Sequence, residues 1–157
     1  MNYRFLQAWA LRLVGIVELL AFGAVVMPAS WMEASHAAMG YPETPKGPVF
    51  DSVMREVSWS YALHGVGMWF IAWDVVRYRP LVILTGFGYL VTCPVFVAID
   101  LSNGMPWFWV VGNGGSCLLV GVVVLGLLWA ERAARNKARS AARDQPSRAA
   151  VSCQEGE

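Results

Sequence analysis

Glu18 is an ionisable side chain inside a long apolar run, "LRLVGIVELLAFGAVVM". A carboxylate surrounded by hydrocarbon must find a cation, gain a proton or border water, and intramembrane carboxylates often mark proton relays. Glu18 is therefore a candidate for a proton-relay role. The structural alternative is a Glu18 that ties helices together, either protonated, hydrogen-bonded to a tyrosine, or reached from the cytoplasmic side by Arg77 or Arg79.

His64 is the second such residue, in the apolar segment "SWSYALHGVGMWFIAWD" at residues 58–74. As a b-type haem ligand it would need a second axial ligand on a facing element. The other histidine, His36, belongs to a polar loop, and Met68 lies on the same predicted helix as His64. This arrangement disfavours haem, although ligation by a methionine or by a loop residue stays open.

Two other interpretations of His64 involve neighbours on other helices. In a quinone or lipid-headgroup site, His64 and Asn113 would supply the polar groups and Trp109 would stack on the ligand. As a structural histidine, His64 would bond to Asn113, to Ser60 or to a free backbone carbonyl. Among these partners, we expect Asn113 on the fourth predicted span to contact His64.

The candidate intramembrane polar or ligand site comprises Glu18, His64, Tyr89, Cys93 and Asn113. With a rise of 1.5 Å per residue, His64, Cys93 and Asn113 each lie about 10 Å below the outer boundary of their predicted spans. These three side chains should form one layer. Glu18 lies about 10 Å from the inner boundary of its span, nearer to the level of Tyr89.

We find no catalytic constellation and no metal-ligand pattern in the sequence. The stretch "GNGGSC" at Gly112–Cys117 is rich in glycine, but it lies inside an apolar run and follows no strand, so it does not predict a phosphate-binding loop. It is typical of a small-residue packing surface. A metal site built from Glu18, His64 and Asp74 would require groups at different depths to converge.

Four apolar runs of membrane-spanning length must position these groups. The chain has 157 residues, of which 57% are hydrophobic and 15% charged, with a mean hydropathy of +0.46; soluble domains have about 25% charged residues. About 20 residues suffice to cross a membrane, and the predicted spans are approximately 11–27, 57–76, 81–99 and 106–129. The sequence therefore predicts an all-α protein with a four-helix transmembrane domain at 1–130, an outer loop at 28–56, and a tail at 131–157.

The basic residues predict the orientation. Of the 12 lysines and arginines, two lie at the start of the first span, two between the second and third, and six after the fourth, whereas Lys46 and Arg55 lie on the other side. Basic flanking segments are retained in the cytoplasm. We therefore expect a multi-pass protein of the bacterial inner membrane with both termini in the cytoplasm. The tail is expected to be basic, partly disordered and able to lie against lipid headgroups, and no fold suggests nucleic-acid binding.

The short connections at 77–80 and 100–106 make successive helices antiparallel neighbours, which predicts an up-down-up-down four-helix bundle. Helical periodicity places one set of residues on a single face of the second span, and we expect this face to point into the bundle: Ser60, His64, Gly67, Ile71, Asp74 and Tyr78. The opposite face, expected to contact lipid, carries Trp59, Ala62, Val66, Trp69, Phe70, Trp73 and Val76.

The outer loop contains signals for the ends of helices. Ser30 and Glu33 have the spacing of a capping box, which predicts a short helix beginning after Ser30. Gly40 suits the end of that helix. Asp51 is expected to cap the second spanning helix.

The segment "LRLVGIVELLAFGAVVMP", followed by a polar outer loop and three further spans, resembles small bacterial four-helix membrane proteins of the DoxX-like kind and their uncharacterised relatives. The resemblance covers about the first 130 residues and rests on the layout of the spans and on the spacing from Arg12 to Gly15. It implies a membrane subunit or redox-associated accessory that works with a partner. It transfers no catalytic residue.

Two functional hypotheses follow. The first is a non-catalytic accessory subunit or homo-oligomeric component of the membrane, without a cofactor, whose partners are lipid, other membrane subunits or further copies of itself. The second is a membrane site for a quinone, haem or proton-coupled substrate built around His64, Asn113, Tyr89 and Glu18.

Overall fold

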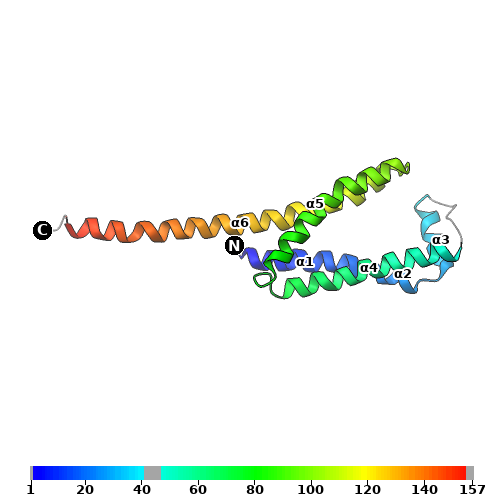
Figure 1. Cartoon of the computed structure of the whole chain (residues 1–157), viewed down its shortest axis with the longest axis horizontal. Coiled ribbons are helices and arrows are strands. Elements are labelled where there is room, and N and C mark those ends of the chain that lie inside the picture. The colour runs from blue at the N-terminus through cyan, green and yellow to red at the C-terminus, as the bar shows by residue number, and fades with distance from the viewer. Residues whose placement is uncertain (1, 41–46, 155–157) are drawn as a thin grey trace. The chain divides into compact units, whose positions relative to one another are not determined.

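The described part of the protein is built from α-helices (Figure 1). The computed structural model describes residues 2–40 and 47–154, with side chains as far as residue 142, and contains no strand in this part of the chain. The predicted all-α class is thus confirmed for these residues. The helices are α1 (Tyr3–Leu19), α2 (Phe22–Val26), α3 (Ala29–Ala38), α4 (Pro48–Trp73), α5 (Arg79–Ser102) and α6 (Trp107–Gln154).

Among the residues that the structure describes, three helical stretches are long and apolar enough to cross a membrane: Tyr3–Val26, Arg79–Ser102 and Trp107–Ala142. They correspond to the first, third and fourth predicted spans, to within one residue at Met27 and Pro106. The second predicted span corresponds to α4, which has 26 residues but is less apolar because it carries Arg55 and several other polar side chains. A membrane crossing by α4 therefore stays a prediction.

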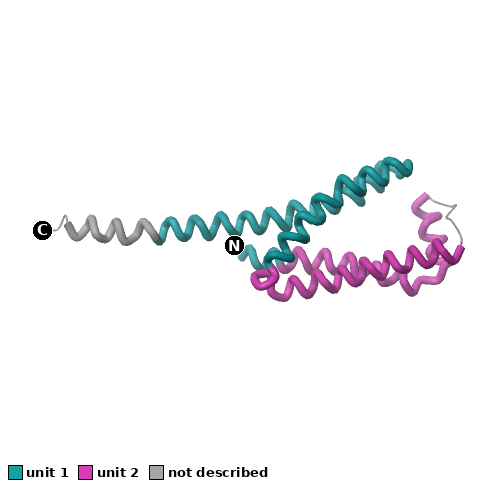
Figure 2. Tube along the Cα trace, in the orientation of Figure 1, with its two compact units in different colours: residues 1–7, 79–157 teal, residues 8–78 magenta. Residues whose placement is uncertain are grey.

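The chain divides into two compact units, drawn in teal and magenta in Figure 2. One unit comprises residues 1–7 and 79–157, and therefore the start of α1 together with α5 and α6. The other comprises residues 8–78, with the rest of α1 followed by α2, α3 and α4. Each unit contains an antiparallel pair of long helices.

In the unit of residues 8–78, α1 and α4 approach most closely at two glycines. A Cβ atom on Gly65 would lie 2.7 Å from the carbonyl oxygen of Gly15, and one on Gly15 would lie 2.8 Å from the carbonyl oxygen of Gly65. Backbones can approach in this way only through small residues. The contact fixes the register of the pair, and Phe22 of α2 accordingly lies against Trp59 of α4, with 6.1 Å between the ring centroids.

Within the unit of residues 8–78, the face of α4 that is buried differs from the predicted inward face. The buried residues of this helix are Ser58, Ala62, Gly65, Met68 and Ala72. Ala62 was expected to contact lipid, whereas Ser60 and His64, expected inside, are exposed. The helix turns its smallest side chains inward because close packing against α1 requires them, and the polar residues lie beside this stripe.

Arg55 connects α4 to the end of α2 in the same unit, at the end predicted to face outward. Its guanidinium donates hydrogen bonds to the backbone carbonyls of Val25 and Met27, the latter at 2.9 Å. The last carbonyls of a helix have no partner within it, so Arg55 satisfies the end of α2. The basic residue nearest the predicted outer surface thus has a local structural role.

The helix boundaries in the outer region differ from the capping predictions. The helix α3 begins at Ala29, before the predicted cap at Ser30, because Pro28 supplies the extended residue that precedes it. Gly40 follows the end of α3 with φ of 91°, as predicted. Asp51 lies within the first turn of α4, whose N-cap is Gly47. Residues 41–46 of the predicted outer loop lie outside the described residues.

In the other unit, α5 and α6 pack along a seam with alternating three- and four-residue spacing, as in coiled coils. The buried positions of α6 are Gly114, Cys117, Gly121, Val124, Leu128 and Glu131. Close packing again uses glycine: a Cβ atom on Gly121 would lie 2.7 Å from Leu90 and 3.0 Å from the carbonyl oxygen of Gly86. Beyond this seam, α6 continues as a helix to Gln154, through most of the predicted tail.

Candidate functional site

Glu18 and His64 form a pair between α1 and α4. The Nδ1 atom of His64 lies 2.8 Å from Oε2 of Glu18. The His64 side chain is 53% exposed and the Glu18 side chain 12%. Two side chains singled out for their chemistry are thus in direct contact, with the carboxylate largely covered and the imidazole at its edge.

The predicted difference in depth between these two residues is wrong. The prediction measured the depth of Glu18 from Leu11, whereas α1 begins at Tyr3. The close approach of Gly15 and Gly65 sets the register instead, and it brings the next turn of α1 to the level of His64. Depth estimated from one helix at a time does not include this contact, because the contact depends on how both helices pack.

The pair has the chemistry of a proton-exchanging dyad. When Nδ1 donates to the carboxylate, Nε2 of the neutral imidazole is an acceptor. Protonation at Nε2 would then create an imidazolium beside a carboxylate, which stabilise each other. Histidine is the side chain whose charge changes most readily near neutral pH, so an accessible imidazole on a covered carboxylate can take up and release a proton.

We expect the Glu18→Gln and His64→Gln variants each to lower the free energy of unfolding by about 1 kcal/mol, the usual contribution of one hydrogen bond to a charged group that is partly exposed. A double-mutant cycle in detergent would measure their coupling. The matched control is Ser60→Ala, because the Ser60 hydroxyl bonds only within its own helix, to the carbonyl of Glu56 at 2.9 Å. Additive losses in the double variant would contradict a direct interaction.

Asn113 has a carboxylate partner within its own unit. Its Nδ2 donates to Oδ2 of the buried Asp100 at 3.1 Å. The backbone of Asp100 also takes part, because its carbonyl accepts a hydrogen bond from the amide of Met105 at 2.9 Å. Gly104, with φ of 68°, completes the turn between α5 and α6. This pair therefore closes the turn end of the helix hairpin.

The five predicted site residues belong to different units. Glu18 and His64 lie in the unit of residues 8–78, whereas Tyr89, Cys93 and Asn113 lie in the unit that contains α5 and α6. Tyr89 and Cys93 are partly buried on α5. The contact between His64 and Asn113, and a site that joins all five residues, stay predictions.

Glu131 forms a charged cluster that the sequence analysis missed. Its carboxylate accepts hydrogen bonds from Nε of Arg4 at 3.0 Å and from Nη1 of Arg79 at 3.1 Å, and a further one from Arg135 one turn along α6. The Glu131 side chain is only 7% exposed. Three guanidinium groups favour the charged carboxylate, because each contributes a charge-assisted hydrogen bond.

A sequence signal for this cluster does exist. Glu131 continues the spacing of Cys117, Val124 and Leu128 on α6, so the packing stripe itself places its side chain inside. An acid at such a position, four residues before an arginine, is typical of a buried ion pair. The sequence analysis considered Arg79 only as a partner of Glu18, whereas the structure places it on Glu131.

Arg12 and Gly15, the two residues of the DoxX-like spacing, both have packing roles. The Arg12 guanidinium carbon lies 5.7 Å from the ring centroid of Trp9 and 5.8 Å from that of Trp69, distances typical of cation–π contacts. Its Nε is buried and has no hydrogen-bond partner in the described structure. Both residues of this spacing therefore contribute to the contact between α1 and α4.

In the part of the chain that the structure describes, no three His, Cys, Asp or Glu side chains gather closely enough to hold a metal ion. Comparisons with protein-family models, curated proteins and solved structures find no match.

Proposed function

We propose that the chain is a small polytopic protein of the bacterial inner membrane that serves as a non-catalytic accessory subunit or oligomeric component. The four spans would be α1 with α2, α4, α5 and the first part of α6, arranged up-down-up-down. The observation that carries this proposal is the pairing of polar groups within each unit. Glu18 pairs with His64, and Asp100 pairs with Asn113. Such pairs stabilise helix association in a membrane.

The exposed surface supports a membrane location. Large apolar side chains are exposed along the outer faces of the helices, including Leu13 and Val17 of α1, Leu84 of α5, and Leu119 and Val122 of α6. Soluble monomers rarely expose contiguous apolar surfaces of this extent. Lipid or the apolar surface of a membrane partner would cover them.

A relationship to DoxX-like proteins is part of the proposal and rests on the layout of the spans.

The Glu131 cluster supports the proposed orientation. Its arginines come from the start of α1, the start of α5 and the part of α6 after its apolar run. These are three of the segments that the distribution of basic charge assigns to the cytoplasm. If these three segments all lie on the cytoplasmic side of the membrane, their arginines can reach the same carboxylate, as they do here.

Cysteine labelling tests the topology. In a chain whose native cysteines are replaced by serine, Ser35→Cys should react with a membrane-impermeant maleimide in spheroplasts, and Ser140→Cys only in inverted membrane vesicles. Equal reaction of both positions from one side would contradict four spans.

Gentle purification followed by mass spectrometry of proteins and organic extracts tests the accessory role. This role predicts a stoichiometric protein partner or a defined homo-oligomer, without a small-molecule ligand.

A second candidate function is a proton-coupled or quinone site at the Glu18–His64 pair. The observation that favours it is the 2.8 Å contact in which the imidazole stays about half exposed. This function predicts that purified protein carries an extractable quinone, or supports pH-dependent transport, and that His64→Gln abolishes either property without unfolding the chain. The non-catalytic role would be supported instead by two observations. The parent protein would carry no ligand, and the His64→Gln variant would fold and keep its partner binding.

A further inference from the structure

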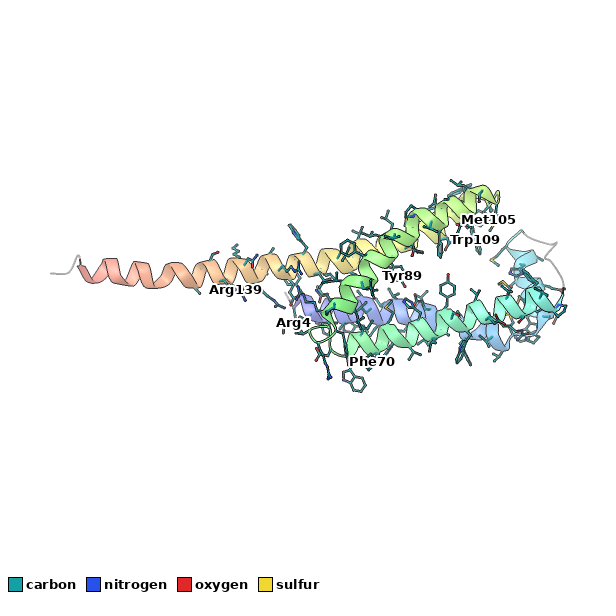
Figure 3. The ribbon with its side chains drawn as sticks, viewed as in Figure 1. Arg4, Phe70, Tyr89, Met105, Trp109 and Arg139 are labelled. Carbon is teal, nitrogen blue, oxygen red and sulfur yellow. The ribbon has the colours of Figure 1, made fainter. Side chains whose placement is uncertain are left out.

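A shallow groove lies beside the Glu131 cluster, in the unit that contains α5 and α6. Its volume is about 390 Å³. One wall is the start of α1, with Asn2, Tyr3 and Arg4, and the other is the part of α6 around Arg135. Figure 3 labels Arg4 near the start of α1 and Arg139 on α6. Arg139 follows Arg135 by four residues, or about one helical turn. The groove is therefore bordered by two segments far apart in the sequence.

The floor of the groove is open because α6 carries only methyl side chains there. Ala134 and Ala138 are one helical turn apart and line the groove. Both are exposed, as is the adjacent Arg135. A group of moderate size can thus approach the helix backbone between the arginines, which longer side chains at these two alanines would prevent.

The groove is positively charged despite Glu131. Three arginines surround this one carboxylate, and the two at the groove use a single donor atom each: Nε of Arg4 and Nη2 of Arg135. A guanidinium has five N–H donors, so both can also bind an anion. The N-terminus of the 17-residue α1 adds the positive end of a helix dipole, with the Asn2 side chain capping the amide of Phe5 at 3.3 Å.

The position of the groove along α6 corresponds to the headgroup layer in the proposed topology. Glu131 and Ala134 of the groove follow Trp129, the end of the apolar run, by about 3 Å and 7.5 Å of helix, and Arg135 follows at about 9 Å, at the outer edge of this layer. The headgroup layer on each side of the hydrocarbon is about 5–8 Å thick. Tyr3 adds an aromatic side chain of the kind that is enriched at this level.

We propose that this groove binds the phosphate of an anionic phospholipid of the cytoplasmic leaflet, with Arg4 and Arg135 as its principal contacts. The inference rests on the proposed membrane topology. The charge, the open alanine floor and the depth all match a phosphodiester attached to acyl chains, which would lie along the apolar surface of the helices. A basic side chain near an anionic leaflet strengthens lipid attraction by about fivefold, so two arginines that also share Glu131 should give a preference of about tenfold or more.

The test is competitive lipid retention by the full chain. Protein in mixed micelles with equal amounts of phosphatidylglycerol and phosphatidylcholine is analysed by native mass spectrometry. The parent chain should retain phosphatidylglycerol with about a tenfold preference. Ala138→Leu fills the groove without changing charge and should remove most of this preference. The matched control, Ala133→Leu, changes an exposed alanine that does not line the groove and should keep it.

A second variant tests the charge of the groove. Asn2→Asp keeps a side chain able to cap α1 but adds a negative charge at the wall, so it should also weaken retention of the anionic lipid. Equal retention of both lipids by the parent chain, or full retention by Ala138→Leu, would overturn the proposal. So would displacement of the lipid by excess inorganic phosphate, which would indicate a site for a free anion. Cysteine labelling reports the topology separately, so each failure can be recognised.

Discussion

Replacing Glu131 with glutamine is expected to destabilise the protein by about 2–4 kcal/mol, since removing one partner of a buried ion pair leaves the others uncompensated. The carboxylate is nearly inaccessible and accepts hydrogen bonds from Arg4, Arg79 and Arg135. The glutamine amide is neutral, so three guanidinium groups would repel one another around it. The arginines are more exposed than Glu131, which keeps the loss at the lower end of this range.

Denaturation of the purified protein in a mild detergent, followed by circular dichroism, measures this loss. The control is Arg132→Gln, which also changes one charge but at an exposed neighbouring position of α6. It should change the free energy of unfolding by less than about 0.5 kcal/mol, as is usual for surface substitutions. The Glu131→Gln/Arg135→Gln double variant should be more stable than Glu131→Gln, because it removes one repelling charge. Similar stabilities for Glu131→Gln and Arg132→Gln would contradict a structural cluster.

Replacing Gly65 with alanine is expected to cost about 2–3 kcal/mol, within the usual range for overpacking a close contact. The new methyl group would lie 2.7 Å from the carbonyl oxygen of Gly15 and 3.1 Å from the amide nitrogen of Leu19. Both are backbone atoms of α1, so no side-chain rotation can relieve the clash. The two helices must move apart, which also lengthens the contact between Glu18 and His64.

Gly67→Ala is the matched control, because it lies two residues further along α4 and a Cβ atom there would meet no atom within 4 Å. Alanine has the higher helix propensity, so this variant should be neutral or slightly stabilising. Thermal unfolding in detergent compares the two. In the Gly65→Ala background, the coupling energy between Glu18 and His64 should also fall. Equal midpoints for both variants would show that α1 and α4 do not approach through these glycines.

Helix content and turn positions could be predicted from the sequence because they depend on local patterns. Long apolar runs and the breaks between them correspond to α1, α5 and α6, and Gly40 ends α3 as its freedom at positive φ allows. The less apolar α4 was recognised by length. These features depend on residues that are near neighbours along the chain.

The face of α4 could not be predicted in the same way. Polarity and small size favour different faces of this helix, and the sequence alone does not rank them. The structure turns Ala62 and Gly65 inward and leaves His64 at the edge. Since the depth of Glu18 depends on the same packing, its contact with His64 was missed although both residues were singled out.

The Glu131 cluster shows a different limit. The orientation rule, the retention of basic residues in the cytoplasm, accounts for the positions of Arg4, Arg79 and Arg135, and the partner considered for Arg79 was Glu18 rather than Glu131. That rule concerns which side of the membrane a segment occupies and says nothing about partners. Only the periodic burial along α6 indicates that Glu131 points inward. A combined analysis of charge and packing period would have identified it.

The hairpin of α5 and α6 is fastened near both ends, by Asp100 with Asn113 and by Arg79 with Glu131. The two fastenings lie 18 residues apart on α6, or about 27 Å, which is close to the 30 Å thickness of a hydrocarbon core. Sliding one helix past the other would break both at once. The length of the hairpin is therefore fixed, and in the proposed topology a bilayer of different thickness would be accommodated by tilting the pair or by deforming the lipid around it.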